Sequence, residues 1–351
     1  FINLFFLFIL FTLLHARILK LDEPKNLAFI TVSGYILLVF LIFYIGQRPV
    51  SGMYFGDMNT YAKYYREYML GAPIKEGKDL LFHIFMKTLS YFVSLHMFFT
   101  IVAIIYIYPL YKISITYFKK YWYYAFIMFV VSYSFYSYGT NGIRNGMATS
   151  VFFLGLCYKD KKAIMIIFFL LSAAFHKTMF LPILAYVLTY FYNSPKFFFK
   201  AWLACIPLSL VLGSVFILIF SSLGFDERLE GYLTTEADEE RFSSTGFRWD
   251  FLFFSAFPVF SGWYFIYKKK FKDIFYNQLL NTYLICNGFW ILVITANFSN
   301  RFAYLSWFMM GIVIIYPLLK ERFFKNQHFI IAQVMFAYFM FTYLMYLLYY
   351  N

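Results

Sequence analysis

Long apolar runs, separated by short polar or basic turns, repeat along the whole chain. Because an open sheet edge cannot satisfy its backbone hydrogen bonds in lipid, runs of this length predict membrane helices. The twelve runs are 1–16, 27–46, 95–112, 121–138, 143–158, 163–175, 178–192, 201–222, 251–267, 274–296, 302–319 and 328–349. We therefore expect an all-α polytopic membrane protein with about 12 transmembrane helices.

Two of these runs are shorter than a membrane crossing requires. A helix rises about 1.5 Å per residue, so neither 163–175 nor 178–192 can cross upright. We expect them to form a hairpin that enters only partway or thins the bilayer locally.

Segment 80–94 has a different pattern. Asp79, His83, Lys87, Ser90 and Ser94 recur at helical spacing, and the opposite face is apolar. We interpret it as an interfacial or re-entrant amphipathic helix. Two alternatives stay open, namely a plain surface helix and a helix whose polar face lines a cavity.

Composition agrees with a membrane protein. The 351 residues are 62% hydrophobic and only 13% charged, against about 25% charged in soluble domains. We expect one integral membrane domain over residues 1–351. The three cysteines lie inside apolar runs without metal spacing, so we interpret them as buried apolar side chains. The run 1–16 lacks a basic leader and a cleavage site, and we treat it as a first helix.

The basic residues predict the orientation. The loops 17–25, 112–120, 159–162, 193–200, 268–273 and 320–326 hold 18 basic and 5 acidic residues. The rest of the chain holds 12 of each, so these loops account for the whole net charge of +13. By the positive-inside rule they are cytoplasmic, and the long loops 47–79 and 223–250 are periplasmic. The basic balance is thus a topology signal, and we expect no nucleic-acid partner.

Three arginines begin helices on the predicted outer side: Arg144, Arg248 and Arg301. A helix N-terminus favours anions, and an arginine adds planar donors suited to phosphate. We prefer a shared cationic pocket for a pyrophosphate, with Lys177 as a further ligand, over separate lipid-headgroup anchors. Neighbouring side chains that are candidates for substrate binding are Tyr61, Asn141, Asn145, Asn297, Asn300 and Tyr304.

Three side chains are candidates for proton transfer. His176 lies between two short apolar helices, where it could accept a proton from a hydroxyl or donate to a phosphate. Asp57 precedes Tyr61 by four residues, so both can face one way on a short helix. Asp250 could equally be a helix-capping residue. The sequence contains no P-loop, no dinucleotide-binding glycine motif and no HExxH, and we expect no cofactor and no metal.

Several short motifs occur in the order found in a known family. They are Asp57…Tyr61, Gly142-Ile143-Arg144, Phe175-His176-Lys177, Gly246-Phe247-Arg248 and Asn300-Arg301-Phe302-Ala303-Tyr304. With this order and its hydropathy profile, the chain resembles the EpsG-like, Wzy-type bacterial polysaccharide polymerases. Asn145 departs from the pattern, because that family commonly has glutamine after the arginine.

The resemblance implies a GT-C-like, metal-independent glycosyltransferase in a bacterial inner membrane, with its active site facing the periplasm. Such enzymes polymerise O-antigen (of lipopolysaccharide), capsule or exopolysaccharide repeat units. They transfer the growing glycan from undecaprenyl pyrophosphate to a hydroxyl of a new lipid-linked unit. Membrane lipid and a chain-length regulator are the other implied partners. In this scheme the three arginines stabilise the leaving pyrophosphate, and His176 is the first choice of base, ahead of Asp57 and Asp250.

Two other classes of function compete with this interpretation. A flippase for the same lipid-linked sugars should place its ionisable groups along a path at mid-membrane. Here they gather at outer helix ends, and no inverted repeat is detectable. A membrane-bound acyltransferase would require a histidine or aspartate near a cytoplasmic acyl donor, whereas His176 is predicted to lie outside.

The predicted orientation can be tested with reporter fusions. Alkaline phosphatase is active only in the periplasm, so a fusion after Arg66 should be active and a fusion after Lys270 inactive. The reverse result would overturn the assignment of the basic loops to the cytoplasm.

Overall fold

The computed structural model describes residues 2–15, 23–75, 79–222, 246–296 and 299–350, and these ranges are helical without a strand. They divide into two compact units, one of residues 1–179 and 318–351 and the other of residues 180–317. We describe each unit by itself. The single integral domain expected from the sequence stays a prediction.

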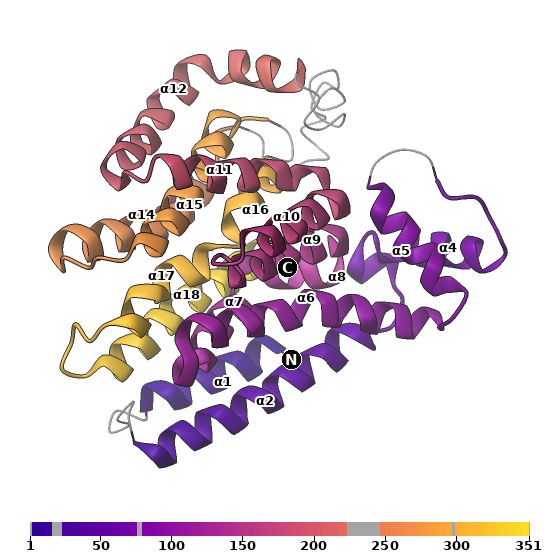
Figure 1. The fold of residues 1–351 in the computed structure, drawn as a ribbon, viewed down its shortest axis with the longest axis horizontal. Helices are drawn as coiled ribbons and strands as arrows, with labels where there is room; N and C mark the ends of the chain where they lie inside the picture. The colour runs from indigo at the N-terminus through magenta and orange to yellow at the C-terminus, as the bar shows by residue number, and fades with distance from the viewer. Residues whose placement is uncertain (1, 16–22, 76–78, 223–245, 297–298, 351) are drawn as a thin grey trace. The chain divides into compact units, whose positions relative to one another are not determined.

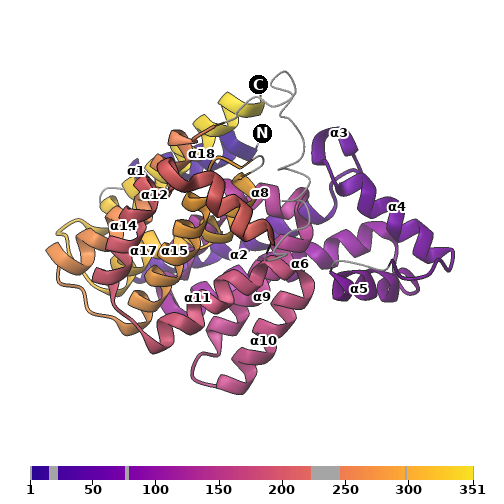
Figure 2. The ribbon, with the colours of Figure 1, turned by 90° about the horizontal axis from the view of Figure 1, so that it is seen from above.

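The first unit contains most of the helices (Figure 1). In chain order they are α1 (Ile2–His15), α2 (Pro24–Gly46), α3 (Gly52–Phe55), α4 (Met58–Met69), α5 (Leu80–Ser90), α6 (Leu95–Phe118), the 3-10 turn η1 (Lys119–Tyr121), α7 (Trp122–Val130), α8 (Tyr133–Thr140), α9 (Ile143–Cys157), α10 (Lys162–Phe175), the 3-10 turn η2 (Lys177–Met179) and α18 (Gln327–Tyr350). Helix α9 packs between α6 and α10, and α2 packs along α6. Figures 1 and 2 both place α4 and α5 side by side at one end of α6.

The second unit has fewer helices and a π-helical turn. They are α11 (Phe180–Phe191), α12 (Pro195–Ser222), α14 (Trp249–Trp263), the π-helix η3 (Tyr264–Lys268), α15 (Ile274–Leu292), α16 (Asn300–Trp307) and α17 (Met310–Lys320), whose last turn belongs to the first unit. Helix α15 is central, because α11, α12, α14 and α16 all pack against it.

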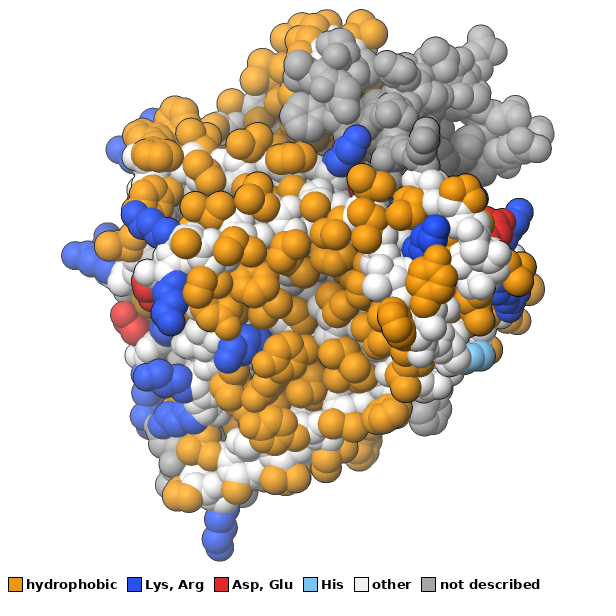
Figure 3. Space-filling model, turned by 45° about the vertical axis from the view of Figure 1, so that its right-hand side comes forward, with side chains coloured by type: hydrophobic (Ala, Val, Ile, Leu, Met, Phe, Trp, Pro, Cys, Tyr) orange, Lys and Arg blue, Asp and Glu red, His pale blue; other side chains and the backbone are white. Residues whose placement is uncertain are grey.

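Five helical stretches in the described ranges are long and apolar enough to cross a membrane. They are Pro24–Gly46, Leu95–Val130, Pro195–Phe220, Asn300–Lys320 and Gln327–Leu348. Hydrophobic side chains cover much of the face shown in Figure 3, as expected of a surface that meets lipid. The chain is therefore a helical membrane protein, and the finer count of twelve crossings stays a prediction.

Two predicted elements differ from the structure in an instructive way. The run 121–138 was expected as one helix, but it breaks between α7 and α8. There the Ser132 hydroxyl donates to the carbonyl of Phe129 at 2.7 Å, a local bond that competes with helix propagation. The amphipathic helix expected over 80–94 ends at Ser90, and Ser94 instead caps α6 by accepting from the Met97 N–H at 3.3 Å.

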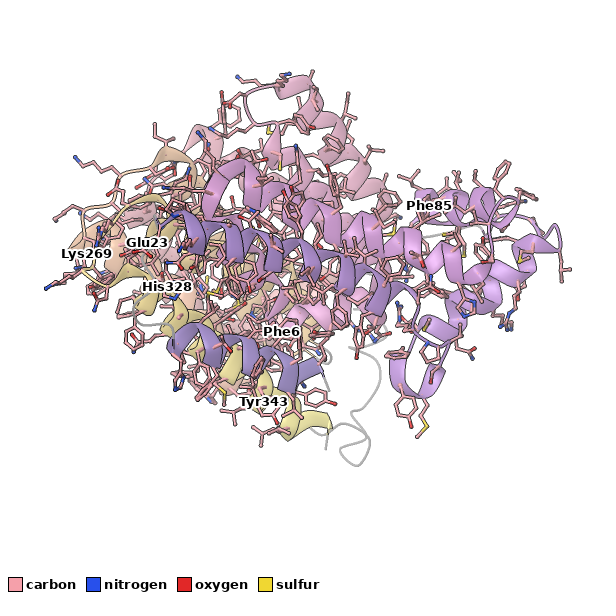
Figure 4. The ribbon with its side chains drawn as sticks, turned by 90° about the horizontal axis from the view of Figure 1, so that it is seen from below. Phe6, Glu23, Phe85, Lys269, His328 and Tyr343 are labelled. Atoms are coloured by element: carbon pink, nitrogen blue, oxygen red, sulfur yellow. The ribbon has the colours of Figure 1, made fainter. Side chains whose placement is uncertain are left out.

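A buried hydrogen-bond chain joins three helices of the first unit. The His328 Nε2 lies 3.2 Å from the carbonyl oxygen of Leu13, which can only accept. The His328 Nδ1 must therefore accept from the Tyr124 hydroxyl, 2.8 Å away. Figure 4 labels His328 at the start of α18 and Phe6 on α1, the helix that packs along α18.

This chain predicts a selective loss of stability. Tyr124→Phe leaves the buried His328 Nδ1 without a donor and should cost about 1–3 kcal/mol of unfolding free energy. Tyr136→Phe is the matched control, because the buried Tyr136 oxygen has no hydrogen-bond partner among the described residues. Thermal unfolding of the purified protein in detergent should show a lower melting temperature for the first variant only. Equal melting temperatures would contradict the hydrogen bond between Tyr124 and His328.

Candidate functional site

The packing of the α4–α5 hairpin positions the first side chains of the site. Tyr61, Tyr65, Phe82, Met86 and Phe98 form one buried apolar cluster with residues of α9. This cluster brings Tyr61 on α4 and Asp79 at the start of α5 against the first turn of α9, where Arg144 lies. A helix is present at Tyr61, but Asp57 lies just before its first residue and is exposed, whereas Tyr61 is buried, so the two side chains do not share one face as expected.

Arg144 is the centre of an ionic cluster. Its Nη1 donates to Asp79 Oδ2 at 2.8 Å, and its Nε donates to the Tyr61 hydroxyl at 3.1 Å. The side chain of Asp79 is only 5% exposed and that of Arg144 18%, so this is a largely buried ion pair. Arg144 Nη2 has no acceptor among the described residues, which leaves one guanidinium nitrogen available for a ligand.

The backbone conformation of Asp79 leaves its side chain available to accept hydrogen bonds from other elements. Asp79 precedes α5 with φ 60° and ψ 45°, in the left-handed region that Asp and Asn tolerate better than most residues. Its side chain does not cap its own helix. Instead Oδ1 accepts the Lys177 backbone N–H at 3.3 Å, and Oδ2 accepts from Arg144.

His176 lies on the other side of the same carboxylate. Its Nε2 is 3.9 Å from Asp79 Oδ2. Its Nδ1 accepts the Thr178 backbone N–H at 3.3 Å and lies 2.7 Å from the Thr178 hydroxyl. Because Nδ1 is an acceptor, a neutral His176 carries its proton on Nε2, which faces the site. This tautomer favours the donor role over the base role.

Tyr61, Asp79, Arg144 and His176 together are called the Arg144 cluster below. Burial raises the pKa of the Tyr61 hydroxyl, and the nearby Arg144 charge opposes that shift, while Asp57 and Asp79 add to it. Tyr61 is therefore a neutral hydrogen-bonding group at physiological pH. Each member comes from a different helix or turn, so the cluster depends on the packing of the first unit.

The other predicted side chains of this unit have supporting positions. Asn141 accepts the Asp57 N–H at 2.8 Å, which holds the turn before α4. Gly56 in that turn has φ 46°, and a Cβ there would come within 2.6 Å of Asn141 Oδ1. The Asp57 carboxylate is exposed, Asn145 takes no part in these hydrogen bonds, and Lys177 contributes its backbone N–H.

The remaining predicted site residues belong to the second part of the chain, residues 180–317. Arg248 Nε and Nη2 donate to the two oxygens of Asp250 at 3.0 and 2.7 Å, so these two candidates form one bidentate pair. Arg301 is exposed in the first turn of α16, beside Asn300, and Tyr304 is buried. Asn297 lies outside the described residues. No three His, Cys, Asp or Glu side chains of the described ranges come together as metal ligands.

Two features of this region were not predicted from the sequence: the pairing of Asp79 with Arg144, and the burial of the polar helix face that carries Asp79 and His83. Asp79 was placed on the polar face of an interfacial helix and was not connected with Arg144. That face is in fact buried, since Asp79 and His83 are 5% and 8% exposed. His83 Nδ1 lies 2.9 Å from the Tyr68 hydroxyl, and burial lowers the pKa of His83. One signal in the sequence could have joined the two residues. The segment around Arg144 contains no acidic residue to pair with it, and Asp79 lies on the polar face of another predicted helix.

The fold and the site together define a helical membrane protein with a buried ionic cluster at the ends of its helices. The EpsG family profile matches residues 36–351. The chain belongs to the EpsG family, a family of Wzy-type polysaccharide polymerase-like proteins. Membership indicates a polymerase-like role in polysaccharide biosynthesis. No curated protein and no solved structure matched the chain.

The ion pair predicts strongly non-additive mutant stabilities. Asp79→Asn, which keeps the left-handed backbone, or Arg144→Gln leaves one buried charge unpaired and should cost about 3 kcal/mol. The double variant should cost much less than the sum, because neither charge remains. Lys75→Gln is the control, since the Lys75–Glu67 pair is 3.4 Å long and largely solvated, and its loss together with the contact of Lys75 on the Tyr64 ring should cost about 1 kcal/mol.

The measurement is unfolding in detergent for the four variants and the wild type. Additive losses in the double variant would show that the two side chains do not interact.

Proposed function

We propose that this protein polymerises lipid-linked oligosaccharide repeat units. In the proposed reaction, a hydroxyl oxygen of the new unit attacks the anomeric carbon of the growing glycan. The bond from that carbon to undecaprenyl pyrophosphate breaks, and its electron pair leaves with the pyrophosphate. We place this step at the periplasmic face of a bacterial inner membrane, without a metal.

The Arg144 cluster is the observation that supports the proposal most. A leaving pyrophosphate gains negative charge, and fixed donors in a site of low dielectric stabilise that charge without reorganising. Arg144 Nη2 and the Nε2–H of His176 are two such donors around one carboxylate. The Asp79 carboxylate balances the arginine when the site is empty and orients its guanidinium, while Thr178 holds the His176 ring.

The acceptor hydroxyl requires a proton acceptor. Of the three candidates from the sequence, His176 has its Nδ1 occupied by Thr178, and Asp250 is held by Arg248. Asp57 has an exposed carboxylate whose charge acts on Tyr61 and therefore lies near the cluster. We assign Asp57 as the base and His176 as a donor to the leaving group.

The remaining roles rest on the sequence. Arg301 is kept as a further candidate for pyrophosphate binding, and Asn300 and Tyr304 for the saccharide. A chain-length regulator as partner, and the particular polymer made, stay predictions of the family resemblance.

The proposal predicts a specific glycan phenotype. In a strain that depends on this protein, Arg144→Lys should reduce the surface glycan from a ladder to single repeat units. Lysine keeps the charge but loses the planar fork that spans Tyr61, Asp79 and the ligand. Arg66→Ala is the control, because Arg66 is an exposed arginine on the neighbouring helix α4, and it should keep the ladder. Gel electrophoresis of extracted glycan, with immunoblotting for protein amount, gives both results.

Two outcomes would refute the proposal. A full ladder from an Arg144→Lys protein of normal abundance would remove Arg144 from the reaction. Loss of every repeat unit from the surface, with lipid-linked units accumulating on the inner leaflet, would favour a flippase.

A further inference from the structure

A buried cation of the first unit lies outside every ion pair described above. Arg48 follows the end of α2 by two residues and is only 7% exposed. Within the described part of the chain no carboxylate pairs with it. Burial lowers the pKa of Arg48 to about 10, so the guanidinium stays charged at neutral pH. Because a buried charge without a counter-ion is costly, other contacts must hold Arg48 in place.

Two backbone carbonyls at helix C-termini accept hydrogen bonds from Arg48. Its Nη1 donates to the carbonyl of Ile45 in the last turn of α2, and its Nη2 donates to the carbonyl of Thr140 at 2.9 Å. Thr140 is the last residue of α8. The final carbonyls of a helix have no partner inside it, and the helix dipole favours a cation there. Arg48 thus joins the end of α2 to the end of α8.

The aromatic contacts of Arg48 add two more helices. Its guanidinium carbon lies 5.6 Å from the ring centre of Phe55 and 5.3 Å from that of Phe99. A cation at this distance from a ring is attracted to it. Phe55 ends α3 and Phe99 belongs to α6. Helices α2, α3, α6 and α8 therefore all contact this one guanidinium group.

These contacts lie next to the turn that precedes α4. Phe55 is followed by Gly56 and Asp57, and Thr140 is followed by Asn141. The Asp57 N–H donates to Asn141 Oδ1 at 2.8 Å. The segments 55–57 and 140–141 are thus joined twice in succession, first through the Arg48 guanidinium and then through the Asn141 side chain.

The segment that Arg48 holds leads directly into α9. Helix α9 begins at Ile143, carries Arg144 in its first turn and has no side-chain cap. The Gly142 N–H before it donates to the carbonyl of Ser137 in α8 at 2.7 Å. The start of α9 is therefore fixed by the end of α8, and a shift of that end would move the Arg144 guanidinium.

We propose that Arg48 is a positioning residue for the pyrophosphate site, because it fixes the end of α8 so that Arg144 presents Nη2 to the ligand. This inference rests on the proposed function, since it requires Arg144 to bind the pyrophosphate. Arg48 is buried and its hydrogen bonds go to backbone carbonyls, so it acts through Arg144 rather than on the ligand.

The test is a thermodynamic cycle on the affinity for undecaprenyl pyrophosphate, measured by isothermal titration of the purified full-length protein in detergent. Arg48→Lys keeps the charge but loses the planar fork that reaches both carbonyls, and it should weaken binding about tenfold. In the Asp79→Asn, Arg144→Gln background the same change should alter the affinity less than about twofold, because the displaced donor is already absent.

A second substitution covers poor folding of the lysine variant. If Arg48→Lys does not accumulate, Arg48→Gln takes its place, since a neutral side chain leaves no charge buried. The cycle also separates its loss of charge from positioning, because a long-range effect of charge on the ligand would appear in both backgrounds.

Tyr124→Phe is the control for stability alone, because it removes a buried hydrogen bond between α7 and α18 of the same unit. It should lower the melting temperature and change the affinity less than about twofold. Equal losses from the Arg48 variant in both backgrounds, or no loss in the wild-type background, would overturn the positioning role. Unchanged affinity of the Asp79→Asn, Arg144→Gln protein would instead refute the proposed function, and the positioning role with it.

Discussion

Asp79 and Arg144 hold two opposite charges largely out of water, and the first unit is built so that this can occur. Removing such charges from water costs several kcal/mol each, and their attraction offsets this only where further hydrogen bonds complete the arrangement. Here Tyr61 and the Lys177 backbone N–H supply those bonds. The hairpin α4–α5, the start of α9 and the turn after α10 must therefore keep their relative positions for the pair to be stable.

The same constraint gives the site its chemical character. Arg144 uses its Nη1 and Nε within the cluster and has no acceptor for Nη2 among the described residues, and the His176 Nε2 lies 3.9 Å from the same carboxylate. Donors that are already oriented need not reorganise when an anion arrives. An anion could thus share Arg144 with Asp79, which accords with a polymerase-like role on lipid-linked substrates.

The sequence predicted those parts of the protein that depend on local pattern. Helix type, membrane character and the helix start at Arg144 followed from apolar run length and from the position of one costly charge. The pairing of Asp79 with Arg144 did not follow, because the residues are 65 positions apart and the polar face that carries Asp79 has the spacing of a surface helix. The hydrogen bond from Thr178 that fixes the His176 tautomer could not be predicted either, since it depends on the turn geometry of η2. Conversely, Arg248 and Asp250 were assigned separate roles although they are two residues apart, and they form one pair.

The central claim is that the Arg144 cluster binds the pyrophosphate end of a lipid-linked glycan. The most direct measurement is the affinity of the purified protein for undecaprenyl pyrophosphate, by isothermal titration in detergent, for the wild type and for the Asp79→Asn, Arg144→Gln double variant, which keeps the cluster without its charges. We predict that the double variant binds at least about tenfold more weakly, as expected for the loss of a charge-assisted hydrogen bond of about 1.5–3 kcal/mol. Equal affinities for the two proteins would contradict the claim.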